Sequence, residues 1–333
     1  MSLFHPPRLI TASNFARDVV TSINHASSRI AVVITTIRAD DTESQQIIDA
    51  LCRAAKRGVM VTVCADAYTY TEPKEFILRS PKRHPMRAYQ AIKVERELKS
   101  HGADFHWLGS RSNFGFAGRT HSKWLIVDDV VYSFGGVNID AGSLTNNDFM
   151  LRIRNQDLAD QLFLQHLRLL KADRANHATK NHQFKIDNHS TVLVDGGLVG
   201  NSIIYRRACH LARDANSVTL VSQYCPTGKL QRILAQKQAI LYFNHWRKAN
   251  WFNKLLITFG MLTTRQATRY SRESYLHAKF IIFTMPNGQK IALTGSHNFM
   301  FTSGLIGTRE IALETTDRTI IKQLEAFLDK HVK

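Results

Sequence analysis

Two short motifs in this sequence each combine an imidazole with an ammonium group. The first places His121 two residues before Lys123, and the second places His277 two residues before Lys279. Each motif leads into an apolar run that is typical of a β-strand, where successive side chains point to opposite faces. The histidine and the lysine of each motif are therefore expected to project to the same side. Each half of the chain would present one reactive imidazole beside one positive charge.

Small residues and an asparagine follow each of these strands. The first copy continues to Gly-Gly-Val-Asn at 135–138, and the second continues to Gly-Ser-His-Asn at 295–298. Small side chains let an anion approach backbone N–H groups, and an asparagine amide can donate a hydrogen bond to it. We expect each turn to bind the oxygens of a phosphate. The residues expected to do so are Gly136, Asn138, Ser296 and Asn298.

Phosphodiester exchange requires the groups that these two motifs supply. It needs a nucleophile, a proton donor for the leaving alcohol, and positive charge around the phosphorus atom. One neutral imidazole can attack phosphorus to form a phosphohistidine, while the other, protonated, delivers a proton to the leaving oxygen. The lysines and asparagines would stabilise the equatorial oxygens. Because the side chains cover every role, we expect neither a metal nor an organic cofactor.

The spacing of these residues resembles the signature of the phospholipase D superfamily, H-x-K-x4-D-x6-G-[GS]-x-N. The first copy matches at every specified position, including Asp128, whereas the second has Thr284 in place of the aspartate and a longer turn. We therefore give Asp128 a structural or supporting role. The resemblance also implies a carboxylate after each motif that orients an imidazole. Asp148 and Glu310 stand at suitable positions.

Segments around the motifs resemble bacterial cardiolipin synthases, from about residue 25 to 315. The similar segments are RGVMVTVCAD, LKSHGADFHWL, RTHSKWLIVDD followed by GGVNI, and SQYCPTGKLQRIL. This resemblance implies a phosphatidyltransferase that exchanges the head group of phosphatidylglycerol, with His121 as nucleophile and His277 as general acid. Three alternatives stay open: a hydrolytic phospholipase D that yields phosphatidic acid, a metal-independent nuclease or phosphodiesterase, and a catalytically silent lipid-binding protein.

The elements that must position these residues alternate between strands and helices. Residues 29–37 have the pattern of a buried strand, 44–58 that of an amphipathic helix, and 59–66 that of the next strand, and the rhythm restarts near residue 190. We expect an α/β (α+β) fold of two pseudo-symmetric phospholipase D-like halves, each a mixed β-sheet flanked by helices, with one shared active site. The expected halves are residues 1–175 and 176–333, joined by a polar linker at 171–184.

The charge of the chain predicts an anionic partner. Its 44 basic and 27 acidic residues give a formal net charge of +17, which suits a phospholipid surface or, as the alternative, nucleic acid. No acidic residue occurs between Asp214 and Glu273. Aromatic residues interrupt this basic stretch, as in elements that lie among lipid head groups. The candidate membrane contacts are Trp246, Trp251 and Phe252; a helix packed on the domain with a solvated basic face is the other interpretation.

The cysteine and hydropathy patterns argue against several classes of protein. The four cysteines are widely spaced, which favours neither a disulfide framework nor a structural zinc site. No apolar run reaches the length of a signal peptide or a membrane span. We therefore expect a cytoplasmic protein that associates peripherally with the inner face of the cell membrane. No sequence feature indicates an obligate protein partner.

Overall fold

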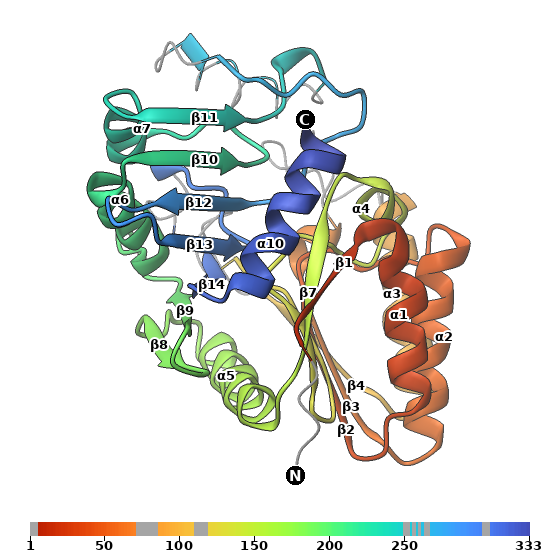
Figure 1. Ribbon diagram of the computed structural model, residues 1–333. Coiled ribbons are helices and arrows are strands. Elements are labelled where there is room, and N and C mark those ends of the chain that lie inside the picture. The colour runs from red at the N-terminus through yellow and green to blue at the C-terminus, as the bar shows by residue number, and fades with distance from the viewer. Residues whose placement is uncertain are drawn as a thin grey trace. The chain divides into compact units, whose positions relative to one another are not determined.

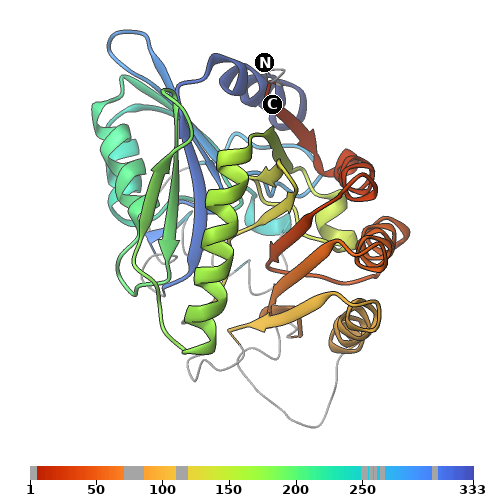
Figure 2. The ribbon, with the colours of Figure 1, turned by 90° about the horizontal axis from the view of Figure 1, so that it is seen from below.

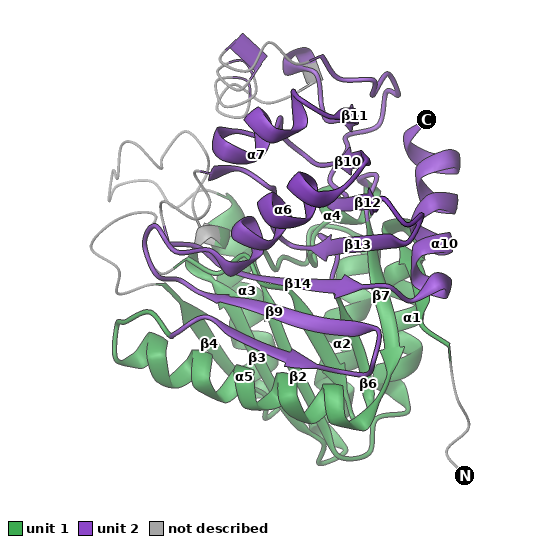
Figure 3. Ribbon diagram, turned by 60° about the vertical axis from the view of Figure 1, so that its left-hand side comes forward, with its two compact units in different colours: residues 1–133, 137–145, 149–179 green, residues 134–136, 146–148, 180–333 purple. Residues whose placement is uncertain are grey.

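The computed structural model describes most of the chain. The described residues are 6–70, 86–109, 119–248, 254, 258, 261–262, 267–301 and 307–333. The chain separates into two compact units (Figure 3). Unit 1 comprises Met1–Ser133, Val137–Thr145 and Phe149–Thr179, and unit 2 comprises Phe134–Gly136, Asn146–Asp148 and Lys180–Lys333. Two short segments of the first half of the sequence thus belong to unit 2.

Unit 1 contains a seven-stranded mixed sheet with the order β1-β7-β6-β5-β2-β3-β4. Figure 1 labels β1, β7, β2, β3 and β4 of this sheet. Its strands β2, β3 and β4 run parallel, and the other neighbours pair antiparallel. The buried runs Val32–Ile34 and Trp124–Val127 lie at its centre. The strands are β1 (Arg8–Thr11), β2 (Arg29–Ile34), β3 (Met60–Asp66), β4 (Asp104–Leu108), β5 (Trp124–Val127), β6 (Val130–Ser133) and β7 (Phe149–Arg154).

Helices cover both faces of this sheet (Figure 2). On one face, Phe15, Ile47 and Leu98 pack against alternate strand residues such as Val63. On the other face, the imidazole of His166 contacts the thiol of Cys64. The helices are α1 (Ala12–Asn24), α2 (Thr42–Lys56), the 3-10 turn η1 (Ala67–Tyr70), α3 (Met86–Ser100), α4 (Ala141–Thr145) and α5 (Gln156–Arg174).

Unit 2 contains a second seven-stranded mixed sheet with the order β11-β10-β12-β13-β14-β9-β8. Among the strands that the structure describes here, only β10 and β11 are parallel neighbours. Its strands are β8 (His182–Lys185), β9 (Ser190–Gly196), β10 (Ser217–Val221), β11 (Gln238–Tyr242), β12 (Phe280–Thr284), β13 (Lys290–Gly295) and β14 (Arg309–Thr315).

The helices of unit 2 also lie on both faces of their sheet. Ile281 and Phe283 share a core with α6 and α7, whereas the ring of Phe280, on the opposite face, contacts Phe327 of α10. Ser202 begins α6 by accepting a hydrogen bond from the N–H of Tyr205. The helices are α6 (Ile203–Asp214), α7 (Gly228–Leu234), the 3-10 turn η2 (Trp246–Lys248), α10 (Arg318–Phe327) and the π-helical turn η3 (Leu328–Val332).

The two sheets repeat one plan. Strands β1, β2, β3, β5, β6 and β7 of unit 1 occupy the same relative order as β9, β10, β11, β12, β13 and β14 of unit 2, with β4 and β8 as additional edge strands. Helices α1 and α2 correspond in chain order to α6 and α7. The expected fold, two halves that are each a mixed sheet flanked by helices, is confirmed.

The predicted linker was partly wrong. Helix α5 extends to Arg174, and the edge strand β8 begins at His182, so both ends of the stretch 171–184 belong to regular elements. The half-exposed pattern of β8 carries too little apolar signal to be read as a strand. In the part of the chain that the structure describes, no helix is long and apolar enough to cross a membrane. The candidate membrane contacts Trp251 and Phe252 lie outside the described residues.

Candidate active site

The first motif lies just before β5 in unit 1. The ammonium group of Lys123 is fully buried. It donates hydrogen bonds to the hydroxyl of Thr35, just after β2, and to the carbonyl oxygen of His121, each at 2.9 Å. A buried ammonium group needs such acceptors to offset the loss of water. Lys123 is therefore held as a fixed charge next to the motif histidine.

Asp66 supports the residue before His121. Its side chain is fully buried at the end of β3. It accepts hydrogen bonds from the backbone N–H of Thr120 at 2.6 Å and from the guanidinium of Arg119 at 2.9 Å. The sequence analysis did not identify Asp66. The one signal that could have done so is a carboxylate directly after the apolar run Val61–Ala65.

Asn138 is held by a polar network within unit 1. Its amide oxygen accepts a hydrogen bond from the N–H of Thr36 at 3.3 Å, and its amide nitrogen donates to the hydroxyl of Ser143 at 3.2 Å. Asp140 accepts from the Thr36 hydroxyl and pairs with the buried guanidinium of Arg38. These contacts fix the orientation of the motif asparagine.

Asp128 has a structural environment. It adopts a left-handed backbone conformation with a φ of 51°, which aspartate tolerates better than most residues. Its carboxylate accepts hydrogen bonds from the backbone N–H groups of Ser27, Ser28 and Arg29 at 2.8–2.9 Å. Burial alone would raise the pKa of Asp128, but these N–H groups outweigh it and lower the pKa. Asp128 thus ties the end of β5 to the loop before β2.

Thr284 occupies the equivalent end of β12 in unit 2. Its backbone carbonyl accepts a hydrogen bond from the N–H of Asn216, in the loop before β10, at 2.8 Å. A backbone contact therefore joins the same two places that Asp128 joins in unit 1. The second motif can therefore lack the aspartate, which agrees with a structural role for Asp128 in the first motif.

The second motif contains a histidine–carboxylate pair within unit 2. Nδ1 of His277 lies 2.6 Å from Oδ2 of Asp148, and both side chains are buried. Because a carboxylate accepts, Nδ1 carries the proton and Nε2 can react. The carbonyl of Asn147 also accepts from the N–H groups of His277 and Ala278, each at 3.0 Å. Asp148 follows the first motif in sequence but orients the histidine of the second.

Lys279 is fully buried beside this pair. Its ammonium group donates to the carbonyl oxygen of His277 at 2.5 Å. Burial lowers the pKa of Lys279 to about 8, although the nearby carboxylates of Asp148 and Glu310 act in the opposite direction. The charge of this side chain is therefore sensitive to pH in the weakly alkaline range.

Gly136 packs directly on the His277–Asp148 pair. A Cβ atom at this position would lie 2.8 Å from Nδ1 of His277 and 3.0 Å from Nζ of Lys279. The N–H of Gly136 points to Asp148 at 3.3 Å. The structure thus gives Gly136 a supporting contact with the carboxylate, and its lack of a side chain lets that carboxylate reach the imidazole.

The second turn supplies a buried hydroxyl and a buried amide. The hydroxyl of Ser296 donates to the carboxylate of Glu310 and accepts from the N–H of Ile311 at 3.0 Å. Asn298 is also buried, and its amide oxygen has no hydrogen-bond partner among the described residues. A buried amide that retains bonding capacity suits a site that a ligand completes.

Asn244 is another buried polar residue near a motif that the sequence analysis did not identify. Its amide oxygen accepts from the N–H of Leu276 at 2.9 Å, and its amide nitrogen donates to the carbonyls of Gln223 and Leu276 at 3.0 and 2.7 Å. It lies in the basic aromatic stretch, whose tryptophans and basic residues indicated a membrane contact and not a buried polar group. Leu276 is the residue immediately before His277.

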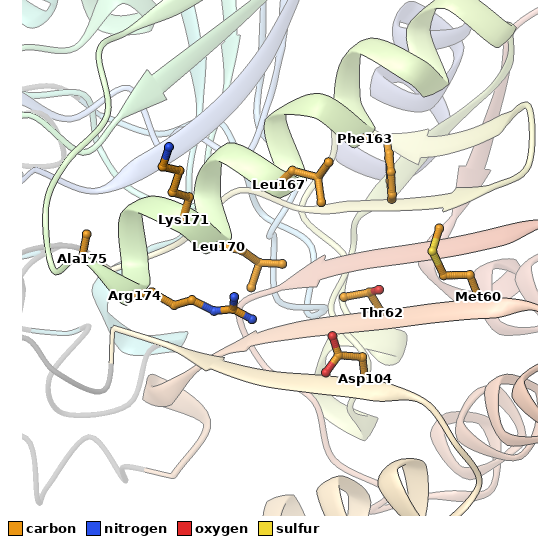
Figure 4. Close-up of a pocket in the computed structure, with 9 residues that line it drawn as sticks. All are labelled: Met60, Thr62, Asp104, Phe163, Leu167, Leu170, Lys171, Arg174 and Ala175. Atoms are coloured by element: carbon orange, nitrogen blue, oxygen red, sulfur yellow. The ribbon is translucent and has the colours of Figure 1, made fainter.

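A groove on unit 1 lies away from both motifs (Figure 4). Its volume is about 690 Å³, and residues of β3, β4 and α5 line it. Met60, Phe163 and Leu167 make most of its wall apolar, and Lys171 and Arg174 lie toward one end. No motif residue lines this groove, so we do not place the chemistry there.

Comparison with known families identifies part of the chain. Residues 19–167 match the family model described as cardiolipin synthase, phospholipase D-like domain. Residues 19–167 form a phospholipase D-like domain. The phospholipase D-like domain therefore contains the complete first motif, Asp66 and Asp148. A search of curated protein sequences finds no significant match to the chain.

The fold of the whole chain is similar to that of solved structures. Phosphatidylserine synthase of Haemophilus influenzae Rd KW20 superposes with a TM-score of 0.74 at 14% identity, over 98% of this chain and 87% of that one. Polyphosphate kinase of Porphyromonas gingivalis superposes with a TM-score of 0.60 at 13% identity, over 97% of this chain and 50% of that one. The family match thus covers residues 19–167, and the two solved structures share the fold of the whole chain.

Proposed function

We propose that this enzyme is a phosphatidyltransferase that exchanges the head group of phosphatidylglycerol through a covalent phosphohistidine. The observation that carries the proposal is the repeated His-x-Lys unit at equivalent places of two equivalent sheets, in a chain whose matched domain is of the cardiolipin synthase type. The phosphatidyltransferase class is supported by the family match, whereas the donor lipid and the intermediate are our proposal.

The proposed reaction has two steps. Nε2 of His121 attacks the phosphorus of one phosphatidylglycerol, the bond to the glycerol oxygen breaks, and protonated His277 gives its proton to the leaving glycerol. His277 then removes a proton from the hydroxyl of a second phosphatidylglycerol, and that oxygen attacks the phosphohistidine. Cardiolipin leaves, and both histidines return to their starting states.

The surrounding residues support these roles. Asp148 keeps the proton of His277 on Nδ1, so that Nε2 exchanges the proton with the alcohol. Lys123 and Lys279 supply buried positive charge for the phosphate oxygens, and Asn138 and Asn298 supply amides. Buried donors that are fixed before the reaction stabilise developing charge more effectively than water does.

A product assay tests the function. The purified chain is incubated with phosphatidylglycerol liposomes, and separately with single-stranded DNA, in the presence of a chelator, and the products are identified by mass spectrometry. We expect cardiolipin and glycerol, and none from His121→Ala. Phosphatidic acid alone would indicate a hydrolytic phospholipase D, and shortened DNA would indicate a nuclease. Loss of turnover on chelation would contradict the proposed mechanism, and so would turnover by His121→Ala.

We also propose that the basic aromatic stretch contacts an anionic membrane, at the inner face of the cell membrane. Trp246 is 38% exposed on η2, and the guanidinium of Arg247 lies 5.4 Å from the centre of its ring. An exposed tryptophan beside an arginine suits the lipid head-group region, where an aromatic ring and a cation both find partners. Trp251 and Phe252 are candidates for the same contact from the sequence alone.

A further inference from the structure

Strand pairing establishes which residues of the two units are equivalent. In unit 1, Val33 of β2 pairs with Cys64 of β3 and Trp124 of β5. In unit 2, Val221 of β10 pairs with Tyr242 of β11 and Phe280 of β12. Two residues after the β3 and β11 positions come Asp66 and Asn244, and four residues before the β5 and β12 positions come Thr120 and Leu276.

The same hydrogen bond occurs at these equivalent positions. The side chain of Asp66 accepts the backbone N–H of Thr120, and the side chain of Asn244 accepts the backbone N–H of Leu276. Both acceptors are fully buried. In each unit the residue that is held immediately precedes the motif histidine. A buried acceptor is therefore present at the same point of both repeats, although one is a carboxylate and the other an amide.

The position of the motif explains why such an acceptor is useful. Strands β5 and β12 begin at Trp124 and Phe280, so each motif histidine stands three residues before its strand. The ladders of β5 and β12 stop short of that backbone, and in unit 2 an isolated bridge joins Leu276 to Asn147. A side chain that binds the preceding N–H group supplies a fixed point there, and small displacements of a reacting group are costly: about 1 Å can reduce the rate 100-fold.

The two repeats differ in charge at this point. Asp66 forms an ion pair with Arg119, whereas Asn244 is neutral and donates to two carbonyls. The residue equivalent to Arg119 is Tyr275, whose hydroxyl accepts a hydrogen bond from the amide of Gln223 at 3.2 Å. The first repeat therefore carries a charged arrangement beside its histidine, and the second carries a neutral one.

We propose that Asp66 and Asn244 are positioning residues for His121 and His277, and that the Asp66–Arg119 pair makes the electrostatic environments of the two imidazoles unequal. Neither residue needs to touch the substrate for this role. The inference rests on the proposed function only in taking the two histidines as the reacting groups, because any phosphoryl transfer through them would require the same positioning.

The first test separates the charge of Asp66 from its acceptor role. Asp66→Asn keeps an acceptor for the Thr120 N–H but removes the negative charge that pairs with Arg119. We expect kcat for bis(p-nitrophenyl) phosphate, a general phosphodiester, to fall about 10- to 100-fold with KM nearly unchanged. NMR titration should show a lower pKa for the imidazole of His121, because a cation near an imidazole disfavours its protonated form. Asp66→Ala should lose at least as much activity.

A matched control and a rescue complete this test. Asp173→Asn also removes a carboxylate of unit 1 that accepts a backbone N–H, that of Gly109 at 2.9 Å, and should change neither kcat nor the His121 titration. Adding Arg119→Gln to Asp66→Asn recreates the neutral arrangement of the second repeat. This double variant should recover most of the lost kcat, whereas Asp66→Ala with Arg119→Gln should not, because it lacks the acceptor.

The second repeat provides the reciprocal test. Asn244→Asp keeps an acceptor for the Leu276 N–H but loses both donated hydrogen bonds, and Asn244→Ala loses all three. We expect both to lower kcat at least 10-fold and to alter the titration of His277 but not that of His121. Thermal unfolding and circular dichroism identify variants that fail to fold. NMR titration of labelled histidine measures the change in the imidazole of His277 without requiring turnover.

The outcomes distinguish this inference from the proposed function. If the wild type cleaves the synthetic phosphodiester but forms no cardiolipin, the proposed lipid function is wrong. The positioning inference can still be tested with the synthetic substrate. The inference is overturned if folded Asp66→Ala and Asn244→Ala retain kcat within twofold. It is also overturned if their losses follow only the unfolded fraction while the histidine titrations stay unchanged.

Discussion

At the scale of single residues, buried side chains outside the two motifs hold the residues before both histidines and the imidazole of His277. The histidines and lysines could be identified from spacing, and the family resemblance indicated Asp148 and Glu310, but neither showed which histidine Asp148 orients. Asp148 follows the first motif and orients His277 of the second, because the segment Asn146–Asp148 belongs to unit 2. Asp66 and Asn244 are isolated polar residues at strand ends, and only the strand register reveals their equivalence.

The buried ammonium of Lys279 predicts a pH limit on catalysis. Burial lowers its pKa to about 8, so it is charged below that pH and neutral above it. Since the charge stabilises the phosphate oxygens, kcat/KM should fall as the pH rises through about 8. Lys279→Arg should move this limb upward, because a guanidinium stays protonated. If the folded arginine variant shows the same alkaline limb in its profile of kcat/KM against pH, the limb belongs to another group.

Asp128 should affect stability rather than chemistry. Removing a carboxylate that accepts three backbone N–H groups leaves those groups without their acceptor, and alanine also fits a left-handed conformation poorly. We expect Asp128→Ala to lower the free energy of unfolding by about 2 kcal/mol, and Asp128→Asn to lower it less, as measured by denaturant unfolding. For the folded fraction, kcat should stay within twofold of wild type; a loss of 10-fold or more would give Asp128 a part in the reaction.

At the scale of elements, periodicity located the strands and helices that carry the motifs. Continuous apolar runs predicted the central strands, and the amphipathic pattern of residues 44–58 predicted most of α2, which Asp41 caps. The edge strands β1 and β8 escaped this reasoning because they are short and only partly buried. β1 pairs with β7, which is distant in sequence, whereas β8 pairs with the next strand, β9.

The start of α6 contains an element whose stability should depend on pH. Asp195 of β9 accepts hydrogen bonds from the hydroxyl of Ser202 at 2.5 Å and from the N–H of Ile203 at 2.6 Å. Burial raises the pKa of Asp195 to about 7, the two hydrogen bonds act against this rise, and the charge of Glu310 adds to it. Its protonated form is therefore favoured by folding.

Because the folded pKa exceeds the unfolded value, this contribution is complete below about pH 4 and is lost as the pH rises through about 7. The wild type should lose unfolding free energy between pH 5 and 8, and Asp195→Asn should lose less, by about 2 kcal/mol. Chemical denaturation at both pH values measures the difference. Asp214→Asn, an exposed change in the same helix, should behave like wild type; identical slopes for wild type and Asp195→Asn would refute the assignment.

At the scale of the whole molecule, the duplication and the net charge of +17 act together. Two repeats supply two imidazoles and two buried ammonium groups, each fixed within its own unit. The positive charge attracts an anionic substrate before any specific contact forms, and salt weakens that attraction. The proposed function therefore predicts that association with anionic vesicles depends on ionic strength and on the basic aromatic stretch.

Cosedimentation with phosphatidylglycerol vesicles separates these two contributions. Replacing Trp246, Trp251 and Phe252 by alanine should reduce binding about 10-fold at physiological salt, because three aromatic side chains contribute on the order of 1 kcal/mol or more to interfacial binding. Raising the salt should weaken binding of the wild type and of the variant alike, since their charges are equal. Val199→Ala, an exposed apolar change outside the stretch, should bind like wild type. Unchanged cosedimentation of the triple variant would show that charge alone brings the enzyme to the membrane.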